Sequence, residues 1–268
     1  MLTGQEERAP AVRVAEFPSE PPDPVARPLL LHDWSELCLV HWRFPAQEVQ
    51  ALLPSGLKVD ICDGSAWVGL VPFHCTIRPR GVPRVPWACS FPEMNVRTYV
   101  RGPNGEPAIW FISLEAARLG AVLIARSVYG LKYFWSKMAF SRVGNVATYE
   151  ARRRWPGARG PRGSLAIAIG EAVGAEELGE IDRWLMNRWR FYCASPVGLV
   201  TGLVAHHPWP LRRARLLHCD PSLVMACGLS KPAGIPLVHY GGEVDVRMTR
   251  PYLVQKRESC LGAMSPAT

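Results

Sequence analysis

Lysine is scarce in this chain. Only five of its 31 basic residues are lysines: Lys58, Lys132, Lys137, Lys231 and Lys256. The basic residues are scattered, apart from 152–154 and 212–213, so they form no basic stripe. We also do not expect the tryptophans to share a strand face with basic residues, as they would in a protein that binds single-stranded nucleic acid. We therefore expect no nucleic-acid partner. The net charge of +8 favours an anionic small molecule over a neutral one.

Signatures of several cofactor and catalytic classes are also missing. The sequence has no Gly-rich phosphate loop, no GxGxxG and no G-x-S-x-G elbow. Its eight cysteines form no Cys-x-x-Cys, and most lie in apolar runs, so we expect reduced, buried thiols. Its seven histidines lack the paired spacing of zinc ligands. We expect neither a cofactor nor a metal, and His206 is the histidine placed to line a cavity mouth.

Targeting and membrane segments are absent as well. No apolar run reaches transmembrane length, and no apolar signal core opens the sequence, so we expect a cytoplasmic protein without a membrane partner. The proline-rich start predicts a disordered tail over residues 1–30, and 252–268 reads as a second loose end. A single domain over 31–251 is expected between them.

Turn dipeptides dominate the rest of the chain. Asp63-Gly64, Asn104-Gly105, Gly144-Asn145 and Gly241-Gly242 each separate two strand-like runs, which predicts antiparallel hairpins. Helices are expected over 115–129, capped by Ser113, over 175–187, and briefly around 221–227. The first is apolar nearly all round and should be buried. The expected class is α+β: a mostly antiparallel sheet curled into a barrel or half-barrel, with one buried helix and one or two outer helices.

One strand carries a row of polar side chains. In FPEMNVRTYV, alternation places Glu93, Asn95, Arg97 and Tyr99 on one face. A carboxylate, an amide and a guanidinium in a row can orient a carboxylate or carbonyl ligand. An ordinary solvent face is the alternative. The next run, AIWFISL, is apolar on both faces and so predicts a covered sheet, which favours the interior interpretation.

Arg126 is the other candidate. It lies near the end of the helix expected to be buried, where an unpaired guanidinium would be costly. We therefore predict Arg126 as an anion clamp in the cavity, with Glu93 as general acid or base.

Several segments, in order, carry a family resemblance. They are HWRFPAQEVQALLPSGLKVDICDGSAWVGLVPF, FPEMNVRTYVRG, PAIWFISLEA, the pair Ala125-Arg126, and HHPWPL. Together they resemble the YqjF-like family of uncharacterised proteins, in the acetoacetate decarboxylase-like superfamily. The resemblance implies a cone-shaped antiparallel barrel with a cavity.

The chain departs from the decarboxylases of that superfamily at the catalytic motif. Those enzymes carry G-R-E-x-x-G-x-P-K-K, whose first lysine forms a Schiff base with a keto acid. Aligned on Arg126 and Gly130, this chain has Tyr133 and Phe134 at the two lysine positions. Ser127 replaces the glutamate and Lys132 the proline, whereas Glu93 stands where those enzymes have a cavity glutamate. The resemblance thus implies a retained cavity and a lost nucleophile.

The leading hypothesis is a barrel that binds a small organic acid or carbonyl compound. Its predicted cavity residues are Glu93, Asn95, Arg97, Arg126, Tyr133 and His206, and any reaction would proceed without lysine. One alternative is a Schiff-base decarboxylase or aldolase-dehydratase that uses Lys132 or Lys137. Another is a non-catalytic sensor or interaction protein. The sequence leaves homo-oligomerisation open.

Overall fold

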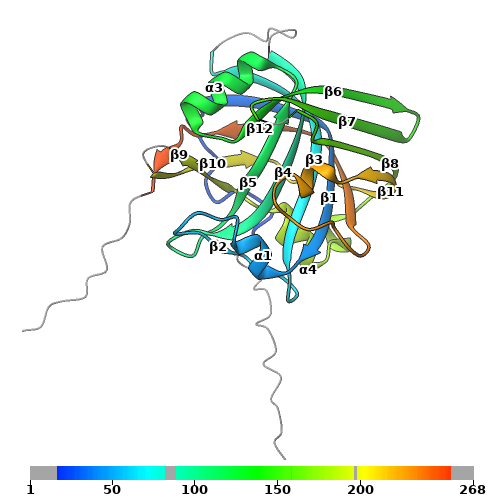
Figure 1. Cartoon of the computed structure of the whole chain (residues 1–268). Helices are drawn as coiled ribbons and strands as arrows, with labels where there is room; N and C mark the ends of the chain where they lie inside the picture. Colours follow the sequence, from blue (N-terminus) through cyan, green and yellow to red (C-terminus); the bar gives the residue numbers. More distant parts are fainter. Residues whose placement is uncertain (1–16, 82–88, 158, 196–197, 255–268) are drawn as a thin grey trace, which may run out of the picture.

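The computed structural model describes residues 17–81, 89–157, 159–195 and 198–254, and it is dominated by strands (Figure 1). The strands are β1 (Leu30–Phe44), β2 (Lys58–Val59), β3 (Ala66–Pro79), β4 (Ser90–Arg101), β5 (Pro107–Ala116), β6 (Tyr133–Val143), β7 (Val146–Trp155), β8 (Arg162–Ala172), β9 (Arg190–Ser195), β10 (Gly198–His206), β11 (Arg212–Asp220), β12 (Leu237–Met248) and β13 (Tyr252–Leu253). The helices are α1 (Ala46–Gln50), α3 (Leu119–Tyr129), α4 (Glu180–Met186) and α5 (Ser222–Met225), with a 3₁₀ turn at Ala175–Glu177.

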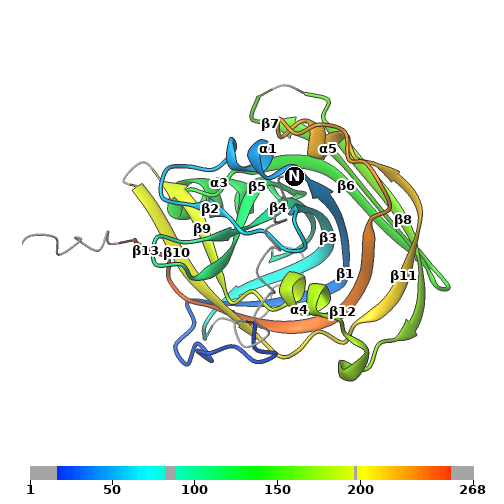
Figure 2. The same cartoon turned by 90° about the horizontal axis from the view of Figure 1, so that it is seen from below.

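These strands form one curled sheet. Their order is β13-β10-β9-β5-β6-β7-β8-β11-β12-β1-β3-β4-β2, and the further pairings β4–β5 and β10–β12 link distant parts of that order. The result is a partly closed ring of strands, which Figure 2 shows from one end. Most neighbours are antiparallel, whereas β5 pairs in parallel with β6 and β9. The expected α+β, mostly antiparallel half-barrel is confirmed.

The hairpins follow the turn dipeptides at two clear places. Asn104-Gly105 joins β4 to β5, and Gly144-Asn145 joins β6 to β7. The hairpin expected at Gly241-Gly242 is wrong, because β12 continues through it. There the pairing with β1 shifts register, and Gly242 has a φ of +64°. A Cβ at Gly241 would lie 2.8 Å from Leu37 Cδ2, so the glycines let the strand bulge against its neighbours.

The predicted buried helix is corrected in both extent and burial. Glu115 belongs to β5, and α3 begins four residues later at Leu119. The helix lies at one end of the ring of strands (Figure 1), where Val122 is fully buried but Leu123 is 48% and Ile124 59% exposed. Its apolar surface is therefore only partly covered. Gly130, in the left-handed conformation, ends the helix and leads the chain into β6.

The strand that carries the polar row is covered on both faces, as expected. Val96 and Met94 of β4 join a core that includes Trp110, Tyr149 and Ile167, on the side of β6, β7, β8 and β11. The opposite side of the same wall packs with α4 in a second core, built from residues such as Val71, Phe73, Tyr99 and Trp184. The second core surrounds the cavity described below.

A bulge interrupts β5 at Ile112. Val96 pairs with Ser113 but the next residue, Arg97, pairs with Phe111, so Ile112 is an extra residue. Before the bulge, the odd-numbered Ile109 and Phe111 line the cavity described below; after it, the even-numbered Leu114 does so instead. The bulge thus reverses which β5 side chains face which core.

The first described residues are not a solvated tail, contrary to the expectation for residues 1–30. Phe17 is 2% and Val25 2% exposed. The Phe17 ring packs against Trp184, and Trp189 Nε1 donates to the Pro18 carbonyl at 3.1 Å. The aromatic side chains give this segment apolar surface to bury, despite its prolines. Residues 1–16 and 255–268 lie outside the described residues.

Some expectations from composition can also be compared with the structure. None of the seven cysteines in the described residues is in a disulfide, and four of them are buried. Among the described helices, none combines the length and apolarity needed to cross a bilayer. The helix expected over 175–187 is divided into the 3₁₀ turn and α4 by Gly179, which caps α4.

Candidate functional site

An internal cavity of about 70 Å³ lies on the second-core side of β4. It is wide enough for about five or six water-sized groups, since each needs roughly 10–15 Å³. Strands β1, β3, β4, β5, β9 and β10 contribute most of its wall. The lining residues are His32, Trp34, Leu37, Val71, Phe73, Cys75, Glu93, Asn95, Arg97, Ile109, Phe111, Leu114, Leu131, Tyr133, Met186, Arg188, Arg190, Phe191, Val204, His206, Trp209 and Met248.

The polar row of β4 points into this cavity. Glu93, Asn95 and Arg97 are 3%, 3% and 7% exposed, and all three line its wall. Period-two alternation continues on the neighbouring strand, where β3 contributes Val71, Phe73 and Cys75. Apolar side chains therefore surround a short line of polar ones, an arrangement typical of small-molecule sites.

Glu93 is paired with a tyrosine and not with a cation. The Tyr133 hydroxyl donates a 2.9 Å hydrogen bond to Glu93 Oε2. Burial raises the pKa of Glu93 to about 8, and the hydrogen bond from Tyr133 offsets only part of that shift. Burial also raises the pKa of Tyr133 well above its usual value, so the phenol stays protonated. At neutral pH the pair is mostly uncharged, and Glu93 can donate as well as accept a hydrogen bond.

Arg97 is a buried cation without a carboxylate partner among the described residues. Its Nη2 lies 3.4 Å from the Tyr99 hydroxyl, a long contact, and its Nε has no hydrogen-bond partner in the described structure. Arg188, which also lines the cavity, is different: its Nη1 donates to Asp60 Oδ2 at 2.7 Å. Arg190, a half-buried lining residue, donates to the hydroxyls of Thr201 and Tyr252. Arg97 is therefore the buried arginine of the cavity wall that lacks a carboxylate partner among the described residues.

Unsatisfied polar atoms gather at the cavity. Buried atoms without a hydrogen bond in the described structure include His32 Nε2, Asn95 Oδ1, Arg97 Nε and Arg188 Nη2. All four belong to lining residues. Because each such atom costs free energy when buried, their common position indicates that the cavity holds a polar occupant or ordered water.

His206 lines the cavity beside two tryptophans. Its ring centroid lies 4.7 Å from that of Trp189 and 4.4 Å from that of Trp209. Burial lowers the pKa of His206 to about 4, so the imidazole is neutral at physiological pH. Its Nδ1 lies 2.6 Å from the His207 carbonyl, which leaves Nε2 as the free acceptor of this side chain. The described residues contain no cluster of three His, Cys, Asp or Glu side chains positioned to hold a metal ion.

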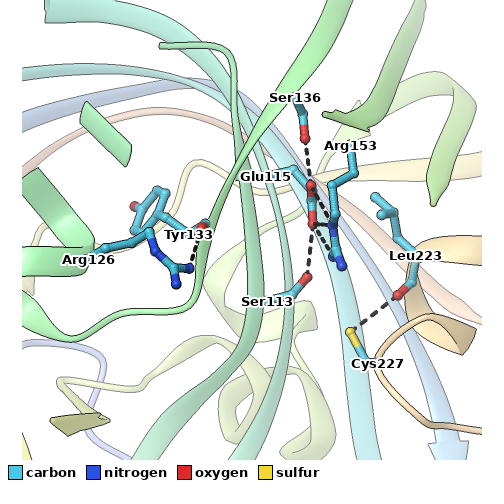
Figure 3. Close-up of polar contacts among 8 residues, drawn as sticks. All are labelled: Ser113, Glu115, Arg126, Tyr133, Ser136, Arg153, Leu223 and Cys227. Atoms are coloured by element: carbon cyan, nitrogen blue, oxygen red, sulfur yellow. Dashed lines mark hydrogen bonds and ion pairs between the residues drawn. The ribbon is translucent and has the colours of Figure 1, made fainter. Parts of the chain in front are cut away.

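The structure does not bring Arg126 into the cavity. Its side chain is exposed on α3, where Nη1 donates to the Tyr133 main-chain carbonyl at 2.9 Å (Figure 3). The prediction of Arg126 as a cavity anion clamp is therefore wrong. It relied on a helix buried on all sides, whereas α3 buries one face, which includes Val122, and Arg126 lies on its exposed face.

The lysines proposed for a Schiff base do not reach the cavity either. Lys132 and Lys137 are both exposed, and neither is a lining residue. Lys132 precedes β6, and Tyr133, the next residue, points inward to Glu93. Lys132 is one residue away from the strand position whose side chain points into the cavity. The Tyr133 hydroxyl, and not the Lys132 amine, therefore lies at the site.

A second buried polar cluster lies across β5, outside the cavity. Arg153 donates to Glu115 through Nε at 3.2 Å and Nη2 at 2.5 Å (Figure 3). Ser136 and Ser113 donate to the same carboxylate at 2.6 and 3.3 Å. Glu115 is fully buried, and Arg153 also lies 3.4 Å from the centroid of the Phe134 ring. Sequence reasoning assigned Glu115 to a helix start and so missed this pair.

Several other lining residues, including Cys75, Arg188 and Trp209, were also not predicted. Arg188 follows α4, and its guanidinium carbon lies 4.5, 4.9 and 4.2 Å from the ring centroids of Phe17, Tyr99 and Trp184. Nothing in its local sequence signals that position. For Trp209, the run HHPWPL was noted only as part of the family resemblance.

Solved structures of similar shape identify the fold. Over 87% of this chain and 91% of the other, the enduracididine biosynthesis enzyme MppR aligns with a TM-score of 0.61 at 12% identity. An acetoacetate decarboxylase-like enzyme from Sphingomonas wittichii RW1 gives 0.59 at 15% identity, over 86% and 94%. Acetoacetate decarboxylase from Legionella pneumophila gives 0.55 at 11% identity, over 95% and 98%. At such identities the likeness shows the fold, which is acetoacetate decarboxylase-like.

Sequence comparison identifies the family. The uncharacterized protein YqjF of Bacillus subtilis (strain 168) is 33% identical over 222 residues, which cover 81% of this chain and 89% of YqjF. The sequence profile of DUF2071, described as an uncharacterized conserved protein, matches residues 32–245. With most of the chain matched by that profile, this protein belongs to the DUF2071 family, as the resemblance to YqjF-like proteins predicted.

Proposed function

We propose that this protein binds a small organic carboxylate in the cavity and that Arg97 holds the carboxylate group. The observation that carries the proposal is the buried Arg97 guanidinium, which lacks an anionic partner in the described structure. A buried charge is costly unless it is paired. A carboxylate ligand would supply the missing partner and could accept two parallel hydrogen bonds from the guanidinium fork.

The size of the cavity limits the ligand. About 70 Å³ accommodates roughly six non-hydrogen atoms, if each occupies about the volume of one water-sized probe. Pyruvate is a molecule of that size, and MppR, which shares the fold, has been solved in complex with pyruvate. For this chain we therefore propose acids of three or four carbons.

The Glu93–Tyr133 pair supports a second polar group on the ligand. A neutral Glu93 carboxyl can donate a hydrogen bond to a carbonyl or hydroxyl oxygen, as a carboxylate could not. A keto or hydroxy acid would then bind with its carboxylate at Arg97 and its second oxygen at Glu93. The same acid is placed for general acid–base chemistry at that oxygen, because its pKa lies near neutrality.

A lysine-independent site is the form of this proposal that the geometry supports. Tyr133 stands where the resemblance places the Schiff-base lysine, and its hydroxyl is engaged with Glu93. A phenol of raised pKa positions and polarises a ligand but does not form an imine. We therefore propose that binding, with or without turnover, proceeds through hydrogen bonds alone.

Two tryptophans in the cavity wall provide a direct test. Trp34 and Trp209 are stacked with ring centroids 6.2 Å apart, and both line the cavity. We expect pyruvate or lactate to change tryptophan fluorescence saturably, with calorimetry giving the same affinity. The corresponding amides, which match in size but lack the charge, should bind at least about tenfold more weakly. Equal affinity for acid and amide would refute the role assigned to Arg97.

Ligand binding should also depend on pH. Above about pH 8, Glu93 ionises and its negative charge opposes an anionic ligand, so we expect affinity for pyruvate to fall by at least about fivefold from pH 7 to pH 9. In Glu93→Gln this decline should disappear. Calorimetric titrations across that range measure it, and an affinity that stays constant in the unmodified protein would contradict the prediction.

The same ionisation predicts the direction of a stability change. Unfolded Glu93 ionises near 4.5 and folded Glu93 near 8, so its contribution to stability is fully present below pH 4.5 and declines as pH rises to about 8. Comparing Glu93→Gln with the unmodified protein at each pH separates this contribution from that of other groups.

A further inference from the structure

A groove runs along the outside of the sheet, between α3 and the outer face of β6 and β7. It has a volume of about 960 Å³ and is separate from the cavity. Its lining residues are Leu119, Leu123, Trp135, Lys137, Arg152, Arg153, Arg154, Trp155, Gly157 and Arg159. We refer to it as the α3 groove.

Strand alternation gathers cations in the α3 groove. Lys137 of β6 pairs in register with Arg152 of β7, and both side chains are exposed on the outer face. Arg154, two residues further along β7, points the same way. Trp135 pairs with Trp155 at the end of the ladder. The basic and aromatic residues therefore do share one face, contrary to the sequence-based expectation.

The charge of the α3 groove is not neutralised from within. None of its lining residues is acidic. Arg153 is paired, because its guanidinium turns inward to Glu115 and forms the floor. Lys137, Arg152, Arg154 and Arg159 are exposed and make no ion pair with another described residue. Four positive charges thus face one hollow, a strong attraction for an anionic partner.

The opposite wall of the groove is apolar. Leu119 is 40% and Leu123 48% exposed on α3. On the strand side, Trp155 is 43% exposed at the end of the ladder and adds apolar surface beside the cations. Side chains of this size gain free energy when apolar atoms cover them. The α3 groove therefore offers one apolar and one cationic wall.

We propose that the α3 groove binds an acidic segment of a partner protein, with aliphatic side chains against Leu119 and Leu123 and carboxylates against Arg152 and Arg154. An amphipathic segment matches both walls at once. A nucleic-acid strand would leave the leucines uncovered, and each indole already carries a guanidinium, Arg154 at 5.0 Å from Trp135 and Arg126 at 5.7 Å from Trp155. A bilayer surface is too flat to fill a hollow.

Fluorescence anisotropy with a labelled peptide tests this proposal. The probe is a peptide of three helical turns, about eleven residues, with Glu on one face and Leu on the other. We expect saturable binding that weakens as salt increases. The double variant Arg152→Gln/Arg154→Gln, and separately Leu123→Gln, should each weaken it at least about tenfold, corresponding to about 1.4 kcal/mol. A peptide with Lys in place of Glu should not bind.

The control removes one positive charge elsewhere and is compared with the single variant Arg152→Gln, which should itself weaken peptide binding. Arg215 is exposed on β11, away from the α3 groove, and Arg215→Gln should leave peptide binding unchanged. Equal losses in Arg215→Gln and Arg152→Gln would show non-specific attraction and overturn the proposal. So would tighter binding of single-stranded oligo-dT, or of vesicles containing phosphatidylserine, through the same residues. The cavity is separate from this site, so a cavity variant should still bind the peptide.

Discussion

Replacing Arg97 with methionine is expected to abolish carboxylate binding without destabilising the fold. Methionine has a similar length and is apolar, so it can occupy the same wall of the cavity. Removing one partner of a buried charged contact costs about 2–5 kcal/mol of binding free energy, so the affinity for pyruvate should fall by at least about 30-fold. Calorimetry measures the affinity, and urea unfolding measures the stability.

The sign of the stability change distinguishes a binding residue from a structural one. In the absence of ligand, Arg97 keeps a charge buried with only a long contact to the Tyr99 hydroxyl. Its removal should leave the free energy of unfolding unchanged or raise it, because the desolvation penalty disappears. A marked loss of stability in Arg97→Met would show that the guanidinium belongs to the architecture.

Two further variants make this comparison sharper. Arg97→Lys keeps the charge but loses the planar fork, and we expect intermediate affinity. Arg188→Met removes a cavity-lining guanidinium that is paired with Asp60, and it should destabilise the protein because Asp60 loses a buried partner. Opposite stability effects at two neighbouring arginines are the expected signature.

Arg153→Met should produce the largest loss of stability. Glu115 is fully buried, and without Arg153 it would retain only the hydroxyls of Ser113 and Ser136 as donors. Breaking a buried ion pair from one side costs about 3–5 kcal/mol. Since domains are typically stable by about 5–15 kcal/mol, much of the folding free energy would be lost. Urea unfolding at neutral pH measures the change.

The expected rescue tests whether the uncompensated carboxylate is the cause. In Arg153→Met/Glu115→Gln the buried charge is gone, and we expect most of the stability to return. Arg152→Met, one residue away on the exposed face of β7, serves as control and should change the free energy of unfolding by no more than about 0.5 kcal/mol. If Arg153→Met behaves like this control, the ion pair is not structurally important.

The polar row of β4 was predictable because it depends on local pattern. Alternation alone places Glu93, Asn95 and Arg97 on one face, and the two-sided apolar run of β5 indicates that the sheet there is covered. The Asn-Gly turn fixes the pairing of these two strands. The family resemblance added the cavity and placed Tyr133 at its wall.

The position of α3 was not predictable in the same way. An apolar helix pattern suggests burial. Whether other parts of the chain cover the helix depends on packing between segments that are far apart in the sequence. Arg126 was misplaced for that reason. The α3 groove depends on the register between β6 and β7 and on where α3 packs relative to them, so local sequence pattern does not reveal it.

The single inserted residue in β5 determines the electrostatic sign of the cavity. If Ile112 instead took an ordinary place in the ladder, alternation from Ile109 and Phe111 would continue through Ser113 and place Glu115 on the cavity face, opposite Glu93. A second acid beside Glu93 would oppose the entry of an anion. The bulge thus keeps the negative charge of Glu115 out of the cavity and on the opposite face of β5, where Arg153 neutralises it.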